Sequence, residues 1–234
     1  AYHAIDLART LGFRSYNIDI MYGLPDQTLE EARLDLKQAV DCGPNHISWY
    51  QLTLEPQTYF YKHPPAIPKH DEAASMMDMG LAFLTESGYA RYEISAYAKD
   101  GAYAQHNKRY WLFDDYLGLG AGAHSKWQDE AGRSFRRENI KHPLRYQDNP
   151  TAATSESIAS DQLPIEFALN FFRLNAFLPW SMFEAKTGLS AVHLKNALKQ
   201  ANQMQLVQHH DQGTQITKKG FLFYNDLISS MLDT

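Results

Sequence analysis

The segment 106–125, which reads HNKRYWLFDDYLGLGAGAHS, concentrates residue types that could bind a flat cofactor. It begins with His106 and carries a second histidine, His124, near its end. The aromatic residues in and next to it are Tyr103, Tyr110, Trp111, Phe113 and Tyr116. An imidazole beside aromatic rings suits a planar ligand and makes the histidine a candidate iron ligand. The plainer alternative is a tight loop with buried aromatic side chains, which composition alone favours.

Three glycines at alternate positions follow, namely Gly118, Gly120 and Gly122. In a helix interior each would cost about 1 kcal/mol relative to alanine, so the segment is not expected to be a core helix. Alternate glycines instead let the backbone come close to a turn, a bulge or a ligand.

Asp19 is a second candidate site residue, because it lies near the C-terminal end of an expected strand, Ser15–Tyr22. Alternation along that strand places Asp19 on the face opposite Ile18 and Ile20. In β/α barrels the chemistry is kept at the C-terminal ends of the strands. A carboxylate that caps a loop or pairs with Arg91 explains the position equally well.

The elements that would position Asp19 alternate between strand and helix. Their expected bounds are a helix around 4–11, a strand at 15–22, a helix from Thr28 to Gly43, a strand at 46–54, a proline-rich loop at 56–68, a helix at 71–87 and a strand at 90–96. Thr28 and Glu31 form a capping box at the start of the helix from Thr28. Thr53 lies at the end of the second strand, in the position that matches Asp19 on the first. The apolar side of the last helix reads Ala74, Met77, Leu81 and Leu84. Connections of this length predict parallel pairing, in a doubly wound sheet or in part of a barrel.

The C-terminal third has a different pattern. We predict a polar linker at 149–162 and a separate domain at 163–234. Three helices, a hairpin within 206–217 and a final helix give the layout of a winged helix. From Asp161 to the end the chain carries six Lys or Arg and six Asp or Glu. A DNA-binding domain would need a basic face, so a packing module is favoured.

Composition limits the possible functions further. The net charge of −5 over 234 residues gives no general attraction to nucleic acid or anionic lipid. A single cysteine, Cys42, excludes an internal disulfide and fits a reducing cytoplasm. It also excludes an iron–sulfur cluster held by this chain alone, because such a cluster needs several thiolates. No apolar run approaches the roughly 20 residues of a membrane helix.

Four motifs occur in a fixed order: NIDIMYGLPDQT at 17–28, YEIS at 92–95, HNKRYW at 106–111 and YLGLGAGAHS at 116–125. Together they resemble the coproporphyrinogen-oxidase-like radical-SAM proteins, and HNKRYW is closest to the heme-chaperone branch of that family. The tail resembles the family's winged-helix-like C-terminal domain, so the resemblance covers essentially the whole chain.

The resemblance implies the C-terminal part of a partial (β/α)6 radical-SAM (TIM-like) barrel, followed by that winged-helix-like α+β domain. Members of the family bind a [4Fe–4S] cluster through a CxxxCxxC loop, and S-adenosylmethionine on the cluster. That loop is absent from this sequence. We therefore expect the missing barrel strands to precede Ala1, and the chain alone to be inactive in radical generation.

The resemblance also implies roles for single residues. Asp19 matches the aspartate that contacts S-adenosylmethionine, and Thr53 and His124 fall at positions that line the same pocket. His106 matches a histidine implicated in heme binding, and we expect it to be a heme-iron ligand. Tyr110 and Trp111 would then flank the porphyrin.

Two more expectations concern charge and the other histidines. Arg136 or Arg137, adjacent in the expected strand 132–139, could pair with a heme propionate. The eight histidines besides His106 and His124 are interpreted as surface or capping residues.

The function predicted from the resemblance is that of a cytoplasmic heme-binding chaperone which passes heme to a recipient protein. One alternative is an oxygen-independent coproporphyrinogen III oxidase, and another is a nucleic-acid-binding winged-helix protein. The exposed edge strand of an incomplete barrel would invite a second copy of the chain, which predicts a homodimer.

Overall fold

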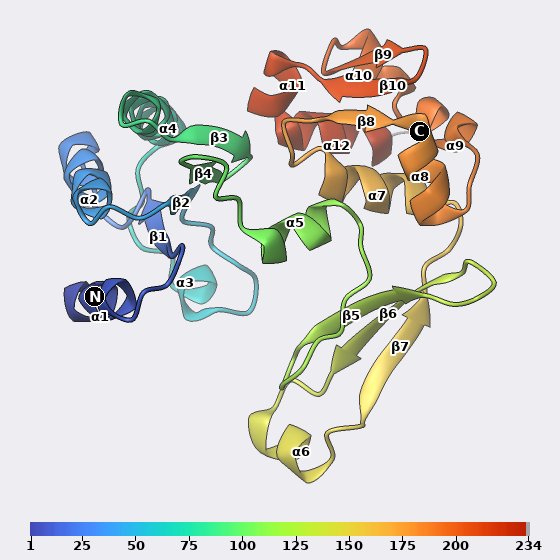
Figure 1. Cartoon of the computed structure of the whole chain (residues 1–234), viewed down its shortest axis with the longest axis horizontal. Coiled ribbons are helices and arrows are strands. Elements are labelled where there is room, and N and C mark those ends of the chain that lie inside the picture. The colour runs from blue at the N-terminus through green and yellow to red at the C-terminus, as the bar shows by residue number, and fades with distance from the viewer. Residues whose placement is uncertain (233–234) are drawn as a thin grey trace. The chain divides into compact units, whose positions relative to one another are not determined.

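The computed structural model describes residues 1–232 and divides into two compact units, Ala1–Ala104 and the part that begins at Gln105. Figure 1 shows both, coloured from blue at the N-terminus to red at the C-terminus. Both units mix helices and strands. Each is described by itself below.

Unit 1 contains a four-stranded sheet with the strand order β1-β2-β4-β3. Its elements are α1 (Tyr2–Thr10), β1 (Asn17–Tyr22), α2 (Leu29–Asp41), β2 (His46–Gln51), α3 (Tyr59–Lys62), α4 (His70–Glu86), β3 (Ala90–Glu93) and β4 (Ala96–Ala98). β1 and β2 are parallel, as expected, whereas β4 lies antiparallel to both β2 and β3.

The expected third strand, 90–96, is therefore wrong as a single element, because it is the first part of a hairpin. Its turn is held by two side chains of β3 that fold back onto it. The Arg91 guanidinium donates to the Ile94 carbonyl oxygen, and the Glu93 carboxylate accepts from the Ser95 amide at 2.9 Å. Because the turn contains neither glycine nor proline, no local sequence signal marks it.

Helices α2 and α4 pack against the sheet and build the core of unit 1. The capping box of Thr28 and Glu31 is confirmed at the start of α2. The predicted apolar side of α4 is confirmed at Leu84, and the half-buried Met77 and Leu81 also pack against this core. The centre of the buried face is shifted by one position, because the other fully buried residues are Ala73, Met76 and Gly80. Gly80 lets the Trp49 indole approach so closely that a β-carbon there would overlap the ring.

The first part of unit 2 combines a short helix with an antiparallel sheet of order β5-β6-β7. The elements are α5 (Gln105–Trp111), β5 (His124–Gln128), β6 (Ser134–Asn139), α6 (Pro143–Asp148) and β7 (Ala153–Ser157). β7 lies within the segment 149–162 that we expected to be a linker. It forms a strand because its backbone pairs with the free edge of β6, from Phe135↔Ser157 to Asn139↔Ala153.

The rest of unit 2 surrounds a second three-stranded sheet, of order β8-β10-β9. Its elements are α7 (Leu163–Phe171), β8 (Phe177–Pro179), α8 (Trp180–Thr187), α9 (Ala191–Ala197), α10 (Lys199–Gln203), β9 (Val207–His210), β10 (Gly213–Ile216), α11 (Lys218–Leu222) and α12 (Tyr224–Leu232). The predicted hairpin is present as β9 and β10. The core of this part is aromatic and is centred on Phe167 and Phe171 of α7 and Phe183 of α8. No helix among residues 1–232 is long and apolar enough to cross a membrane.

Candidate functional site

Asp19 lies on β1 with its side chain on the exposed face of the sheet, while Ile18 and Ile20 pack toward the helices. This is the placement that the strand alternation predicted. One carboxylate oxygen, Oδ1, accepts a hydrogen bond of 2.8 Å from the Asn17 side-chain amide. Arg91, the alternative partner considered for Asp19, instead donates to the Ile94 carbonyl oxygen.

Behind Asp19 the sheet carries polar side chains that the sequence analysis did not single out. Asn17 Oδ1 lies 2.6 Å from His46 Nδ1, and the other ring nitrogen, Nε2, lies 2.7 Å from the Tyr92 hydroxyl. The Tyr92 oxygen also accepts from the Ala104 amide at 3.2 Å. These contacts join β1, β2 and β3 on the side of the sheet that bears Asp19.

His46 is only 2% exposed, so its interpretation as a surface or capping residue is wrong. Burial lowers the pKa of His46 below its usual 6.5, and the nearby Asp19 carboxylate partly opposes that effect. Burial also raises the pKa of Tyr92 to about 12. Both groups are therefore neutral near pH 7 and able to form directional hydrogen bonds. The available signal was the alternation of His46 and Ser48 with the buried Ile47 and Trp49.

Thr53 lies two residues past the end of β2, in an exposed position. The expected strand 46–54 is therefore wrong over its last three residues, because β2 ends at Gln51. Parallel pairing ends at Tyr22↔Gln51, although the Leu52 amide still donates to the Tyr22 carbonyl oxygen at 2.8 Å. Thr53 thus belongs to the loop that leaves the C-terminal end of the strand.

His106 is exposed on α5, one turn before Tyr110. The Tyr110 hydroxyl lies 3.1 Å from His106 Nε2, and the two rings meet edge to face with centroids 4.9 Å apart. Tyr110 also contacts Tyr116, with centroids 4.6 Å apart. The structure therefore brings together the histidine of the HNKRYW motif and two aromatic rings within unit 2.

Trp111 differs from Tyr110 in its surroundings. It is half-buried, and the Arg173 guanidinium lies 4.4 Å from the centre of its ring. A cation at that distance stacks on the indole. One face of the Trp111 indole is thus already covered by Arg173, which follows the C-terminal end of α7.

The glycine segment is a turn that leads into β5. The Gly118 amide donates to Ser125 Oγ at 2.9 Å, and the Asn139 side-chain amide donates to the Gly118 and Gly120 carbonyl oxygens at 3.2 and 3.0 Å. Gly120 and Gly122 have positive φ, which L-residues with side chains rarely adopt. Gly118 serves close backbone approach, since a β-carbon there would overlap the His124 carbonyl oxygen, whereas Gly120 and Gly122 supply the positive φ of the turn.

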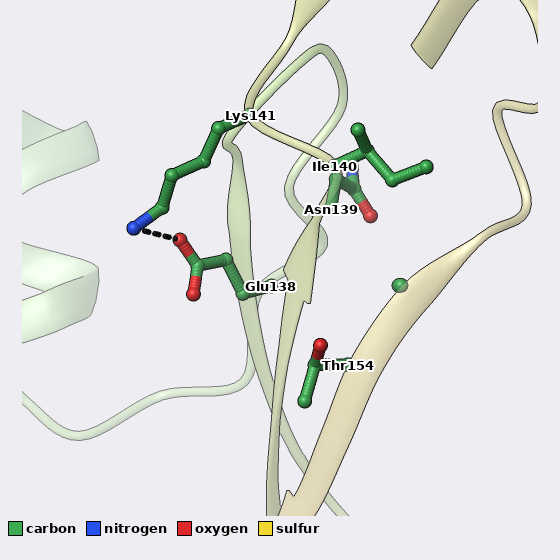
Figure 2. Close-up of a pocket in the computed structure, with 6 residues that line it drawn as sticks. Glu138, Asn139, Ile140, Lys141 and Thr154 are labelled. Carbon is green, nitrogen blue, oxygen red and sulfur yellow. Dashed lines mark ion pairs between the residues drawn. The ribbon is translucent and has the colours of Figure 1, made fainter. Parts of the chain in front are cut away.

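His124 is the first residue of β5, and 57% of its side chain is exposed. Its Nε2 lies 3.6 Å from Glu138 Oε1 across the β5–β6 pair. Glu138 also pairs with Lys141 at 3.0 Å, and the lysine holds the pKa of this carboxyl below its ordinary value. The end of β6, the following Ile140 and Lys141, and the start of β7 line an open hollow of about 390 Å³. Figure 2 shows the Glu138–Lys141 ion pair among the residues that line it.

The two arginines proposed for a propionate do have protein partners. Arg136 forms an ion pair with Glu166, and Arg137 donates to the Thr151 carbonyl oxygen at 2.9 Å. Because Arg136 is neutralised by a carboxylate, its charge is not free for a second anion.

The described residues do not suit an iron–sulfur cluster. Cys42 is a free thiol and the single cysteine of the sequence. Within residues 1–232, the structure also brings no three His, Cys, Asp or Glu side chains together in a way that could hold a metal ion. A cubane cluster needs several thiolate ligands, so this chain does not supply them.

Comparison with known proteins places these observations in context. The HemN C-terminal domain model matches residues 158–223. The heme chaperone HemW of Haemophilus influenzae is 42% identical over 98% of this chain, which corresponds to 60% of that protein. HemW of Escherichia coli is 41% identical over 99% of the chain and 61% of the relative. The chain thus spans about three fifths of the length of these curated relatives.

A solved structure gives a consistent result for the fold. The structure titled "Coproporphyrinogen III oxidase (HemN) from Escherichia coli is a Radical SAM enzyme" matches 98% of this chain and 57% of its own, with a TM-score of 0.78 and 22% identity. At that identity the likeness shows the fold alone. The resemblance predicted from the four motifs is confirmed by the sequence identity to the two HemW relatives.

Proposed function

We propose that this chain, whose sequence is related to the heme chaperone HemW, is part of a protein that binds heme and transfers it to a recipient protein. The observation that carries the proposal is the HNKRYW motif, which presents His106 on an exposed helix beside Tyr110 and Tyr116. The names of the relatives, at 42% and 41% identity along nearly the whole chain, support the same function.

His106 is the proposed ligand of the heme iron. Its Nε2 faces the Tyr110 hydroxyl, so ligation through this nitrogen would replace one hydrogen bond. The Tyr110 ring, placed edge to face with the imidazole, would then contact the porphyrin. We assign Trp111 a weaker part, because Arg173 already covers one face of its indole.

Asp19, Thr53 and His124 are proposed to contact S-adenosylmethionine in a longer protein that supplies the iron–sulfur ligands. The residues present fit such a ligand in one respect. Asp19 is exposed, and its Oδ1 accepts from Asn17, which leaves acceptor capacity for hydroxyl donors such as those of a ribose. S-adenosylmethionine would supply radical chemistry only together with a reduced cluster, which other residues must hold.

For the fold we propose the finer description that the motifs imply. β1, β2 and β3 would belong to a partial radical-SAM barrel, and β8–β10 with the surrounding helices to a winged-helix-like domain at 163–234. The match of residues 158–223 to the HemN C-terminal domain supports that second assignment.

A hemin titration tests the heme assignment. We expect a shifted Soret band on addition of hemin, and at least a ten-fold weaker affinity in His106→Ala. His193→Ala is the matched control, because His193 is also an exposed helical histidine of unit 2. Equal binding by the two variants would remove His106 as the ligand.

An oxidase remains the second candidate, supported by the shared fold with the coproporphyrinogen III oxidase structure. Turnover of coproporphyrinogen III by the full-length, cluster-loaded protein would favour it over the chaperone. A DNA affinity that falls steeply with salt would instead favour the winged-helix alternative.

A further inference from the structure

The face of the unit 1 sheet that bears Asp19 carries a continuous series of hydrogen bonds that ends on the Asp19 carboxylate. The strand register creates it, because Asn17 lies opposite His46 and Asp19 lies opposite Ser48 in the parallel β1–β2 pair. Tyr92, from β3, reaches the far side of His46. Four consecutive contacts therefore connect the Ala104 amide, Tyr92, His46, Asn17 and Asp19.

The chemistry of the groups fixes the direction of each bond. Asp19 can only accept, so Asn17 must present its NH₂ group to Asp19 and its carbonyl oxygen to His46. A carbonyl oxygen also only accepts, so His46 must carry its proton on Nδ1. In a neutral ring Nε2 is then bare and accepts, and the Tyr92 hydroxyl must donate to it.

The remaining groups along the series agree with this assignment. The Tyr92 oxygen still accepts the Ala104 N–H, which uses its lone pair and not its proton. Ser48 Oγ donates to the same Asn17 oxygen at 3.2 Å. The neutral ring is the form that burial favours, and stacking on Tyr103 with centroids 4.3 Å apart holds the Tyr92 ring in place. Every donor in the series thus points toward Asp19.

We propose that His46, in its Nδ1–H tautomer, is a positioning residue that holds Asn17 and through it orients the Asp19 carboxylate toward its ligand. Asn17 and Asp19 lie on one strand face, two residues apart, where the Asp19 side chain would otherwise be free to rotate. Because each bond in a directed chain polarises the next, the series strengthens the final contact on the carboxylate. The proposal rests on the proposed contact between Asp19 and S-adenosylmethionine.

Two amide substitutions separate the roles of the ring nitrogens. In His46→Asn the side-chain NH₂ occupies roughly the position of Nδ1 and can still donate to Asn17. In His46→Gln the NH₂ group lies near the position of Nε2, so the donor to the Asn17 oxygen is lost. Both variants remove the aromatic ring from the same buried site, so each is the packing control of the other.

Isothermal titration calorimetry of the full-length protein with S-adenosylmethionine measures the first readout, the binding affinity. We expect His46→Gln to bind about five-fold more weakly, the scale of one hydrogen bond between neutral groups, because the donor to the Asn17 oxygen is lost. His46→Asn should remain within about two-fold of the unsubstituted protein, by the same reasoning. Equal losses in the two variants would overturn the positioning role.

The tautomer itself can be measured without any ligand. In ¹⁵N–¹H correlation spectra near pH 7.5, His46 should show a protonated Nδ1 and an unprotonated Nε2, and Tyr92→Phe should weaken that preference. An Nε2–H tautomer would overturn the chain of hydrogen bonds. Unchanged S-adenosylmethionine binding in Asp19→Asn would instead overturn the proposed ligand contact, so the two failures are distinguishable.

Discussion

The regions around Asp19 and His124 are built in different ways. Asp19 is oriented by side chains, since Asn17, His46 and Tyr92 connect three strands behind it. The region around His124 is shaped by the backbone, where Gly118 and Gly120 turn against β5 and Asn139 fastens their carbonyl oxygens. Side-chain substitutions around Asp19 should therefore weaken the orientation of its carboxylate step by step. Around His124 they should have little effect, unless they replace one of the glycines or Asn139.

The two histidines make the same contrast. His46 is buried and contacts a hydrogen-bonding group at each ring nitrogen, whereas His106 is exposed and its Nε2 meets a tyrosine of its own helix. A ring that is held on both sides suits a positioning role, and an exposed ring suits an incoming ligand. The HNKRYW motif identified His106, but only the structure distinguishes its environment from that of His46.

The largest effect should come from Gly118→Ala. A β-carbon at Gly118 would overlap the His124 carbonyl oxygen, which is backbone and cannot move aside without disturbing β5. We expect a loss of about 3 kcal/mol in the unfolding free energy of unit 2, the upper range for overpacking. Denaturant unfolding monitored by the tryptophans of unit 2 measures it.

Gly132→Ala provides the control for that prediction. Gly132 has positive φ, unlike Gly118, and a β-carbon there would meet nothing within 4 Å. Its cost should be limited to backbone strain, about 1 kcal/mol. If both variants lost the same stability, close packing of the glycine turn against β5 would not be its important feature.

Asn139→Asp should have the next largest effect. The substitution keeps the shape of the side chain but replaces its NH₂ donor with an oxygen that faces two carbonyl oxygens in a buried position. We expect a loss of about 2 kcal/mol at pH 7. Recovery at acidic pH should accompany it, because a protonated carboxyl can donate again.

The same measurement on Asn202→Asp tests whether the environment matters. Asn202 is exposed on α10, so its substitution should change the stability by less than about 0.5 kcal/mol. A loss at Asn202 as large as that at Asn139 would contradict the role assigned to the buried amide.

Sequence reasoning succeeded where the signal is local. The Thr28–Glu31 capping box, the alternation around Asp19 and the turn at the alternate glycines all depend on residues a few positions apart. It failed where residues distant in sequence decide the result. The shifted face of α4 depends on Trp49 lying against Gly80, and the role of His46 depends on Tyr92.

Two further differences have the same origin. Residues 153–157 are polar and read as a linker, but they form β7 because β6 offers an unpaired edge. The Arg173 guanidinium that stacks on Trp111 was likewise not predicted, because no local pattern connects the two residues. The composition of a segment does not show which distant residues will pair with its backbone or stack on its side chains.

A smaller effect should appear in the pH dependence of stability. Burial lowers the pKa of His46 in the folded chain, so the unfolded chain takes up a proton near pH 6.5 while the folded chain does not. The stabilisation from a neutral His46 is therefore complete above about pH 6.5 and is lost as the pH falls below that value. The nearby Asp19 carboxylate opposes the shift and keeps the effect modest.

Comparison of the chain with His46→Asn between pH 7.5 and 5 isolates this contribution. Other groups, including His209, whose pKa is also lowered by burial, are present in both proteins and cancel in the difference. The unsubstituted chain should lose more stability than the variant as the pH falls. Parallel pH profiles would show that His46 does not titrate differently on folding.

The smallest effect on stability should come from Tyr110→Phe, which sharpens the contrast between the two histidines. The variant removes the hydroxyl near His106 Nε2 but keeps the ring that meets the imidazole edge to face. Because His106 is exposed, we expect a change below about 0.5 kcal/mol in unfolding free energy. Hemin affinity should be unchanged or slightly tighter, since ligation no longer has to displace a hydrogen bond. A loss of the Soret shift as large as in His106→Ala would mean instead that the hydroxyl, and not only the ring, contributes to the heme site.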